Sequence, residues 1–156
     1  MMASQTDLAA AIADLCRTRF VNVGRTLNMV EVGFMRGDDE VRLHVQCPFR
    51  LVRHSKVLLG STDYLYPLKA HSDRAVAFDR YETQFDRRAQ ILTEALGDGL
   101  PVREAHLRDD GAFYLATADE LRIEVFPAVS GPIECWRLFV KGSDKHYVYP
   151  PAADEN

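Results

Sequence analysis

A chain of 156 residues has the usual length of one domain, and its 47% content of hydrophobic residues suffices for a packed core, which excludes a disordered chain. The formal net charge is −4 with both signs interspersed, which argues against non-specific binding of nucleic acid. No apolar run in the sequence is long enough to cross a membrane as a helix.

The first predicted element is an amphipathic helix near the N-terminus. Ser4 and Thr6 are residues that cap helices, and apolar side chains follow at helical spacing as far as Cys16. Asp7 and a second aspartate interrupt this apolar stretch, so we expect it to belong to the fold and not to a signal peptide. Gly24 is expected to end the segment.

Alternating apolar and polar residues then predict antiparallel strands joined by short turns. Residues 36–39 form the turn of a first hairpin, and His54 and Ser55 form the turn of a second. A loop of residues 60–63 follows, and residues 64–77 have no clear periodicity. The strands predicted here are residues 30–34, 41–45, 49–53 and 56–59.

Apolar residues that recur every three or four positions predict a second helix over residues 78–96. Asp79 is its expected cap, Gly97 suits the left-handed position that ends a helix, and Pro101 prevents continuation. The polar tail of residues 150–156 is expected to fray. The strands predicted after this helix are residues 102–107, 112–116, 120–126, 134–141 and 145–149.

Two parts of the sequence resemble each other. Residues 40–45 read EVRLHV and residues 120–125 read ELRIEV, and a shift of eighty residues superimposes them without a gap. Cys47 and Cys135 fall at corresponding places in the two parts. Half-buried strands resemble one another by composition alone, so coincidence is the alternative to duplication.

We therefore predict a single α+β domain over residues 1–156 that is built from two pseudo-equivalent halves. Residues 4–77 and residues 78–149 would each form a helix followed by four or five mainly antiparallel strands. The helices are expected to pack on one face of the sheet, with the halves arranged around a pseudo-two-fold axis as in a homodimer. A true homodimer, formed through an edge strand, is also open.

The sheet face away from the helices is predicted to carry polar and charged residues. Any half-buried strand alternates in this way, so a solvated face is one interpretation and a protein-binding surface is the other. On a binding surface, Phe126 and one of the pair Trp136 and Phe139 would be the aromatic anchors. The outward set is Arg42, His44, Gln46, Arg122, Glu124 and Phe126.

Two arginines are candidates for binding a small ligand. Arg50 and Arg137 are each followed by leucine, and a guanidinium held on a strand can bind a carboxylate through two parallel hydrogen bonds. Internal ion pairs with Glu134, Asp63 or Glu124 are the alternative.

The loop that contains Asp63 and Tyr64 is a further candidate, because loops often carry function. It lacks the glycine spacing of phosphate-binding motifs, and a structural role, with Asp63 bonding back to the loop backbone, is the alternative. Together with Arg50 and Arg137, these residues predict a small-molecule pocket between the halves.

The residues predict no catalytic site, metal or cofactor, and the balance is against an enzyme. The five histidines have no zinc-site spacing, and three widely spaced cysteines form neither a disulfide framework nor a zinc site. A thiolate nucleophile at Cys47 or Cys135, beside His44 or His146, is an alternative to two small apolar core residues. We expect reduced thiols and a cytoplasmic location.

Three short motifs of the chain are Arg50-Leu51-Val52, Gly60-Ser61-Thr62-Asp63 and Glu134-Cys135-Trp136-Arg137-Leu138. They resemble a type of small uncharacterised bacterial domain with a Gly-Ser-x-Asp loop midway and a Trp-Arg-Leu strand near the C-terminus. The resemblance covers the chain from about Leu27 onward. Such domains are similar in size and style to immunity proteins of bacterial toxin systems, so the resemblance implies protein binding and no catalytic residue. This chain lacks a long acidic patch of the kind that neutralises a basic nuclease toxin.

The predicted function is specific protein binding of the immunity or accessory type. The partner would be occluded by the sheet face and by the loop of residues 127–133. The alternative is a small-molecule-binding domain or an enzyme with a pocket between the halves. A protein partner is expected, but no nucleic acid or membrane. The candidate binding residues are Arg50, Asp63, Tyr64, Phe126, Glu134, Trp136 and Arg137.

Overall fold

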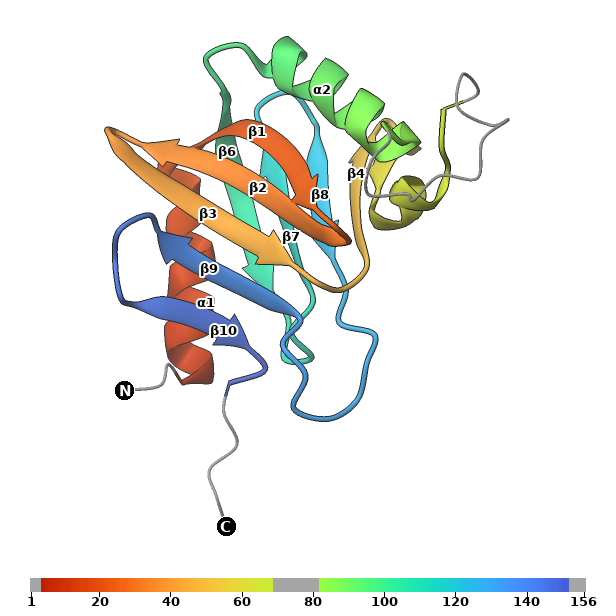
Figure 1. Ribbon diagram of the computed structural model, residues 1–156. Coiled ribbons are helices and arrows are strands. Elements are labelled where there is room, and N and C mark those ends of the chain that lie inside the picture. The colour runs from red at the N-terminus through yellow and green to blue at the C-terminus, as the bar shows by residue number, and fades with distance from the viewer. Residues whose placement is uncertain (1–3, 69–81, 152–156) are drawn as a thin grey trace.

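The structure is a computed structural model that describes residues 4–68 and 82–151 (Figure 1). Within these residues the protein has an α+β fold with a ten-stranded antiparallel sheet and two α-helices, which confirms the predicted class. The elements before residue 69 are α1 (Gln5–Ala13), η1 (Asp14–Arg17), β1 (Arg19–Thr26), β2 (Met29–Arg36), β3 (Asp39–Val45), β4 (Phe49–Arg53), β5 (Lys56–Gly60) and η2 (Ser61–Leu65), where η marks a short 3₁₀ helix. The later elements are α2 (Gln84–Leu96), β6 (Leu100–Leu107), β7 (Phe113–Thr117), β8 (Arg122–Val125), β9 (Trp136–Val140) and β10 (His146–Tyr149).

The strand order in the sheet is β10-β9-β3-β2-β1-β6-β7-β8-β4-β5. The first five strands in this order form the front sheet, the other five form the rear sheet, and Figure 1 shows β2, β3 and β9 in front of β6 and β7. The β4–β5 hairpin pairs with β8, and the β9–β10 hairpin pairs with β3. If each of β1 to β5 is exchanged with the strand whose number is five higher (β1 with β6, β2 with β7 and so on), the strand order becomes the same list read backwards. Each sheet therefore contains a hairpin from the other part of the chain.

The helices follow the same exchange. α1 packs against β6 and β10, whereas α2 packs against β1, β5 and η2. Each helix therefore lies against strands of both sheets, at different places in the molecule (Figure 1). The expected packing of both helices on one face is not confirmed.

The strand β1 lies where the sequence pattern predicted the end of the first helix. α1 stops at Ala13, and Gly24 lies inside β1 and does not end a helix. A β-bulge between Phe20 and Asn22 interrupts the alternation of buried and exposed residues, since Phe20 and Val23 are both buried. Because the bulge makes the alternation of buried and exposed residues irregular, a search for strict alternation does not detect this strand.

The buried side chains form one core between the two sheets. Trp136 lies in it with no exposed surface, and its Nε1–H donates a hydrogen bond to the carbonyl of Gly111 over 2.9 Å. The Trp136 ring stacks on Tyr149 and meets Phe113 edge-on, at centroid distances of 5.9 and 5.2 Å. Gly111 has a φ of +84°, and a Cβ there would lie 2.2 Å from the Tyr149 ring. These contacts hold the β9–β10 hairpin of the front sheet on the β6–β7 turn of the rear sheet.

α2 begins later than the sequence predicted. Thr83 is its cap, and Thr83 and Asp86 form a capping box in which each side chain accepts a hydrogen bond from the other's backbone N–H. The expected cap Asp79 lies outside the described residues. Gly97 follows the helix with a φ of +54°, so the predicted end is confirmed.

Asp86 also fixes α2 to the front sheet. The Arg25 guanidinium on β1 donates two hydrogen bonds to the Asp86 carboxylate, from Nε over 2.9 Å and from Nη2 over 2.8 Å. Partial burial raises the pKa of the Asp86 carboxyl, but the hydrogen bonds from Arg25 and Thr83 lower it by more, so the pKa lies below its usual range.

We expect Asp86→Asn to lower the free energy of unfolding by about 1–2 kcal/mol at neutral pH, because the charge-assisted hydrogen bonds are lost. A carboxyl whose pKa is lowered by folding stabilises the protein above its unfolded pKa of about 3.9, and the effect is lost as pH falls through the folded pKa. The gap between wild type and variant should therefore close below about pH 4. Urea unfolding at neutral and acidic pH measures the difference in free energy of unfolding between wild type and variant, with Asp38→Asn in the exposed β2–β3 turn as control. A gap that is unchanged in acid would contradict this account.

Candidate functional site

The exchange of hairpins requires two connections to cross between the sheets. Residues 46–48 join β3 to β4, and residues 126–135 join β8 to β9. The two connections are bonded where they meet: Phe126 N–H donates to the Pro48 carbonyl over 2.9 Å, and Gln46 N–H donates to the Cys135 carbonyl over 2.7 Å. The longer of them, residues 126–135, is called the crossing loop below.

Two cysteines lie at this crossing, one on each connection. Cys47 and Cys135 are buried, and the Cys135 thiol donates a hydrogen bond to the Ile133 carbonyl over 3.4 Å. Burial raises the pKa of the Cys47 thiol to about 12 and also raises the pKa of Cys135. Both thiols are therefore protonated at neutral pH, which favours the interpretation as core residues over that as nucleophiles.

We expect iodoacetamide to alkylate Cys16 in the native protein while Cys47 and Cys135 stay unmodified, because only Cys16 is exposed. All three should react after denaturation in urea. Peptide mass spectrometry of samples quenched over time gives the rate at each site. Alkylation of Cys47 or Cys135 in the native protein as fast as that of Cys16 would mean that the crossing is open to solvent.

The crossing loop presents apolar side chains to solvent. Phe126 is 38% exposed, Val129 48% and Ile133 54%. Gly131, with a φ of +86°, allows the turn between Val129 and Ile133. Single exposed apolar residues are common on protein surfaces, whereas three within one loop of ten residues are a local concentration of apolar side chains.

Ion pairs hold both ends of this loop. At its start, Arg50 on β4 pairs with Glu124 on β8, and the Arg50 guanidinium lies 5.4 Å from the centre of the Phe126 ring. At its end, Arg137 Nη2 donates to Glu134 over 2.6 Å, and this hydrogen bond raises the pKa of Arg137. An ion pair between β4 and β8 thus flanks the start of the loop, and a local ion pair flanks its end.

Beside the Glu134 end, the outward face of the front sheet carries aromatic rings. Phe139 on β9 meets His44 on β3 edge-on at 5.0 Å and stacks on His146 of β10 at 4.4 Å. Arg137 Nη1 donates to Nδ1 of His146 over 2.7 Å, so that nitrogen carries no proton. Partial burial lowers the pKa of His44, which keeps its ring neutral at pH 7. This face therefore combines flat rings with the Arg137–Glu134 ion pair and, further along β3, the Arg42–Glu40 ion pair.

The structure brings four of the predicted binding residues to the crossing loop. Arg50 and Phe126 lie at its start, and Glu134 and Arg137 lie at its end. Trp136 is buried, so Phe139 is the member of that pair that lies on the outward face.

The remaining candidates lie elsewhere and have structural partners. The Asp63 carboxylate accepts hydrogen bonds from the Gly60 N–H over 2.9 Å and from the Gln84 side chain over 3.2 Å. Tyr64 packs against the core. Arg50 on β4 and Arg137 on β9 belong to different sheets, separated in the strand order by β3, β2, β1, β6, β7 and β8. The strand order thus does not place these residues on neighbouring strands, and the pocket between the halves stays a prediction.

Sequence reasoning selected the loop of residues 127–133 but not its apolar side chains. Val129 lies between Pro127 and Gly131, and Ile133 follows Pro132. Turn-forming residues predict a loop, so the apolar residues among them were not selected. Apolar residues in a predicted loop indicate a binding surface only when two or three of them occur together. The ring partners of Phe139 come from two other strands, β3 and β10, and no sequence period predicts these contacts.

Within residues 4–68 and 82–151, no three His, Cys, Asp or Glu side chains are grouped as metal ligands. No helix of this part is both long and apolar enough to cross a membrane. Compared with protein-family models, curated proteins and solved structures, the chain gives no significant match. The resemblance to immunity-type domains stays a prediction.

Proposed function

We propose that the protein binds a specific protein partner through the crossing loop and the adjacent outward face of the front sheet. The observation that carries this proposal is the exposure of Phe126, Val129 and Ile133 on one loop that is fixed at both ends. Interfaces take most of their binding free energy from a few apolar or aromatic side chains at their centre, surrounded by polar groups.

The fixed ends of the loop favour tight binding. Cys135 N–H donates to the Tyr149 carbonyl over 2.8 Å, and the Gln46 side chain donates to Glu134 over 3.2 Å. A loop held by such bonds loses little conformational entropy when a partner docks, and lost entropy is a main cost of association. Val129 and Ile133 would enter an apolar depression on the partner, and occlusion of the partner's surface would be the mechanism.

The polar surroundings suit a partner surface of mixed charge. The Arg50–Glu124 and Glu134–Arg137 pairs flank the loop, and Phe139 with His44 offers a flat apolar area beside it. Charges of both signs at the edge of an interface give specificity and orientation more than affinity. This proposal places the protein in the cytoplasm, because its cysteines are free thiols.

Ile133→Asp is expected to weaken partner binding about tenfold or more, because it places a charge at the centre of the apolar contact. Ile91→Asp on α2 is the matched control, since Ile91 and Ile133 have the same residue type and the same exposed fraction of 54%. Tagged wild type and both variants are used to retrieve partners from source cells at low salt, with mass spectrometry of retained proteins and metabolites.

A stoichiometric partner that is held by the wild type and Ile91→Asp but lost from Ile133→Asp supports the proposal. Equal retention by both variants would exclude the crossing loop as the binding element. A retained metabolite without any protein partner would instead favour a small-molecule-binding domain or enzyme. The mass of the purified wild type over a range of concentrations separates a homodimer from a hetero-complex.

We also propose that residues 4–77 and 78–149 are pseudo-equivalent halves that arose by duplication. The strand order supports this proposal, because exchanging β1–β5 with β6–β10 gives the same order read backwards. The matching segments of β3 and β8, EVRLHV and ELRIEV, agree with it. In a homodimer of one such unit, each copy would give its last hairpin to the other, as in domain swapping.

A further inference from the structure

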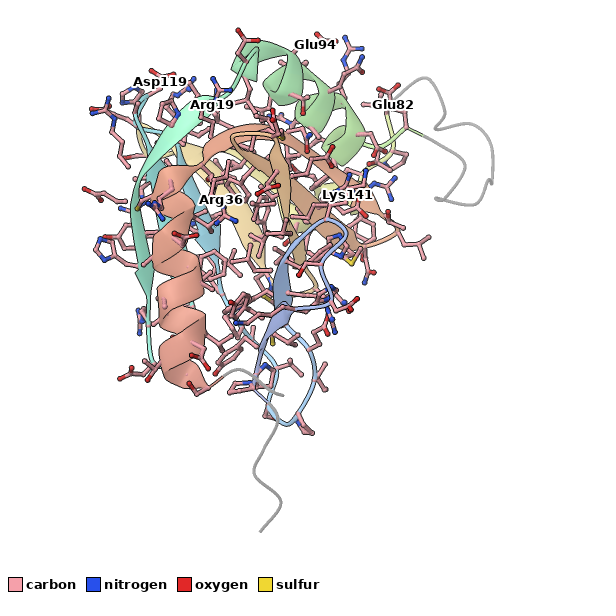
Figure 2. The ribbon with its side chains drawn as sticks, turned by 90° about the vertical axis from the view of Figure 1, so that its left-hand side faces the viewer. Arg19, Arg36, Glu82, Glu94, Asp119 and Lys141 are labelled. Carbon is pink, nitrogen blue, oxygen red and sulfur yellow. The ribbon has the colours of Figure 1, made fainter. Side chains whose placement is uncertain are left out.

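A hollow of about 410 Å³ lies between α1 and the β9–β10 hairpin, away from the crossing loop. Its volume is in the range of small-molecule sites. Ala11 and Leu15 line it from the helix, and Leu138 and Val140 line it from β9. Arg36 at the end of β2 also lines it and lies beside α1 (Figure 2).

The corresponding place beneath α2 is occupied by the protein itself. α2 packs against β5 and η2 there, with Phe85 of its first turn buried and Tyr64 of η2 packed on the core. α1 has small Ala10 and Ala11 where it faces the hollow, and no helix follows β10 within the described residues as η2 follows β5. The two places have the same strand environment, so the difference comes from these side chains and from η2.

One cation at the hollow makes no contact ion pair with a described residue. Asp14 accepts from Arg36, and Asp7 accepts from Ser4 in the cap of α1, so these groups are satisfied within the protein. No carboxylate oxygen of the described residues lies within 4.0 Å of the Lys145 ammonium, which stands 5.3 Å from the centre of the Tyr147 ring. Asp7 lines the same hollow, and the charge of Lys145 contributes to lowering the pKa of its carboxyl, so the formal charges there balance. The Lys145 ammonium nevertheless has no hydrogen-bond acceptor within contact distance among the described residues, so its N–H groups are available to a ligand.

A hydroxyl donor accompanies this cation. Ser143 Oγ accepts a hydrogen bond from the Lys145 backbone N–H over 3.1 Å, which leaves its own proton free to donate. Ser143 and Lys145 both line the hollow from the β9–β10 turn, whereas Leu15, Leu138 and Val140 line its apolar part. Donors at one end and apolar side chains along the rest are the arrangement that selects an amphipathic anion.

We propose that this hollow binds a small monocarboxylate with an apolar body. The carboxylate accepts hydrogen bonds from Lys145 and Ser143, and the body packs on Leu15, Leu138 and Val140. This site is independent of the proposed protein-binding loop, so either proposal can fail alone.

Isothermal titration calorimetry with three probes of equal chain length, octanoate, octan-1-ol and octylammonium, tests the proposal. Octanoate is expected to bind most tightly and octylammonium least. Lys145→Met keeps the apolar stem but removes the charge, and it should weaken octanoate about tenfold while octan-1-ol is unchanged. Octylammonium binding as tightly as octanoate, or no heat from octanoate at millimolar concentration, would overturn the proposal.

A pair of variants on α1 locates the site. Ala11→Leu fills the hollow with a good helix former and should abolish octanoate binding, whereas Ala9→Leu, exposed on the same helix and outside the hollow, should not. Thermal unfolding of both variants verifies that the fold is retained. Octanoate binding that persists in folded Ala11→Leu would place the ligand elsewhere and overturn the proposal. The Lys145→Met result decides the matter if Ala11→Leu does not fold.

Discussion

The hydrogen-bonded crossing of the β3–β4 connection and the crossing loop is the constraint on which the rest of the structure depends. It lets β4–β5 complete the rear sheet and β9–β10 complete the front sheet, so neither sheet reaches five strands from its own part of the chain. The bonds from Phe126 to Pro48 and from Gln46 to Cys135 fix the connections where they meet. Cys47 and Cys135 fill the space at this point, where larger side chains would separate the connections. Trp136 then binds the exchanged hairpin to the opposite sheet through Gly111.

Both proposed sites follow from this exchange. The two connections differ in length, because three residues make one crossing and ten make the other, and the surplus residues form the loop that displays Val129 and Ile133. At the far end of the same hairpin, β10 lies under α1, and the hollow beside Lys145 lies between them where the described part of the chain, which ends at residue 151, has no counterpart of η2. Both proposals thus concern places where residues 4–68 and 82–151 depart from the regular exchange of strands.

The sequence predicted much of the local structure but little of the pairing. Alternation located β2 to β5, and Gly97 located the end of α2, because these signals are short-range. The β1 strand was missed since its bulge breaks the period, and Thr83 was passed over as a cap. Arg50, Phe126, Glu134 and Arg137 were named as binding candidates on separate grounds, and no sequence signal placed them around one loop. Trp136 was not separable from Phe139, because the face of a strand depends on its partner strand. No local pattern shows that β9 pairs with β3, so the hollow and the outward face could not be predicted.

The most direct test of the central claim is a nuclear Overhauser measurement of backbone proton contacts across the strands. The exchanged arrangement predicts contacts between Leu43 of β3 and Leu138 of β9, and between Leu51 of β4 and Ile123 of β8. Contacts of Leu43 with Leu51 and of Ile123 with Leu138 would show that each hairpin stays with its own half. That result would remove the crossing, and with it the basis for both proposed sites.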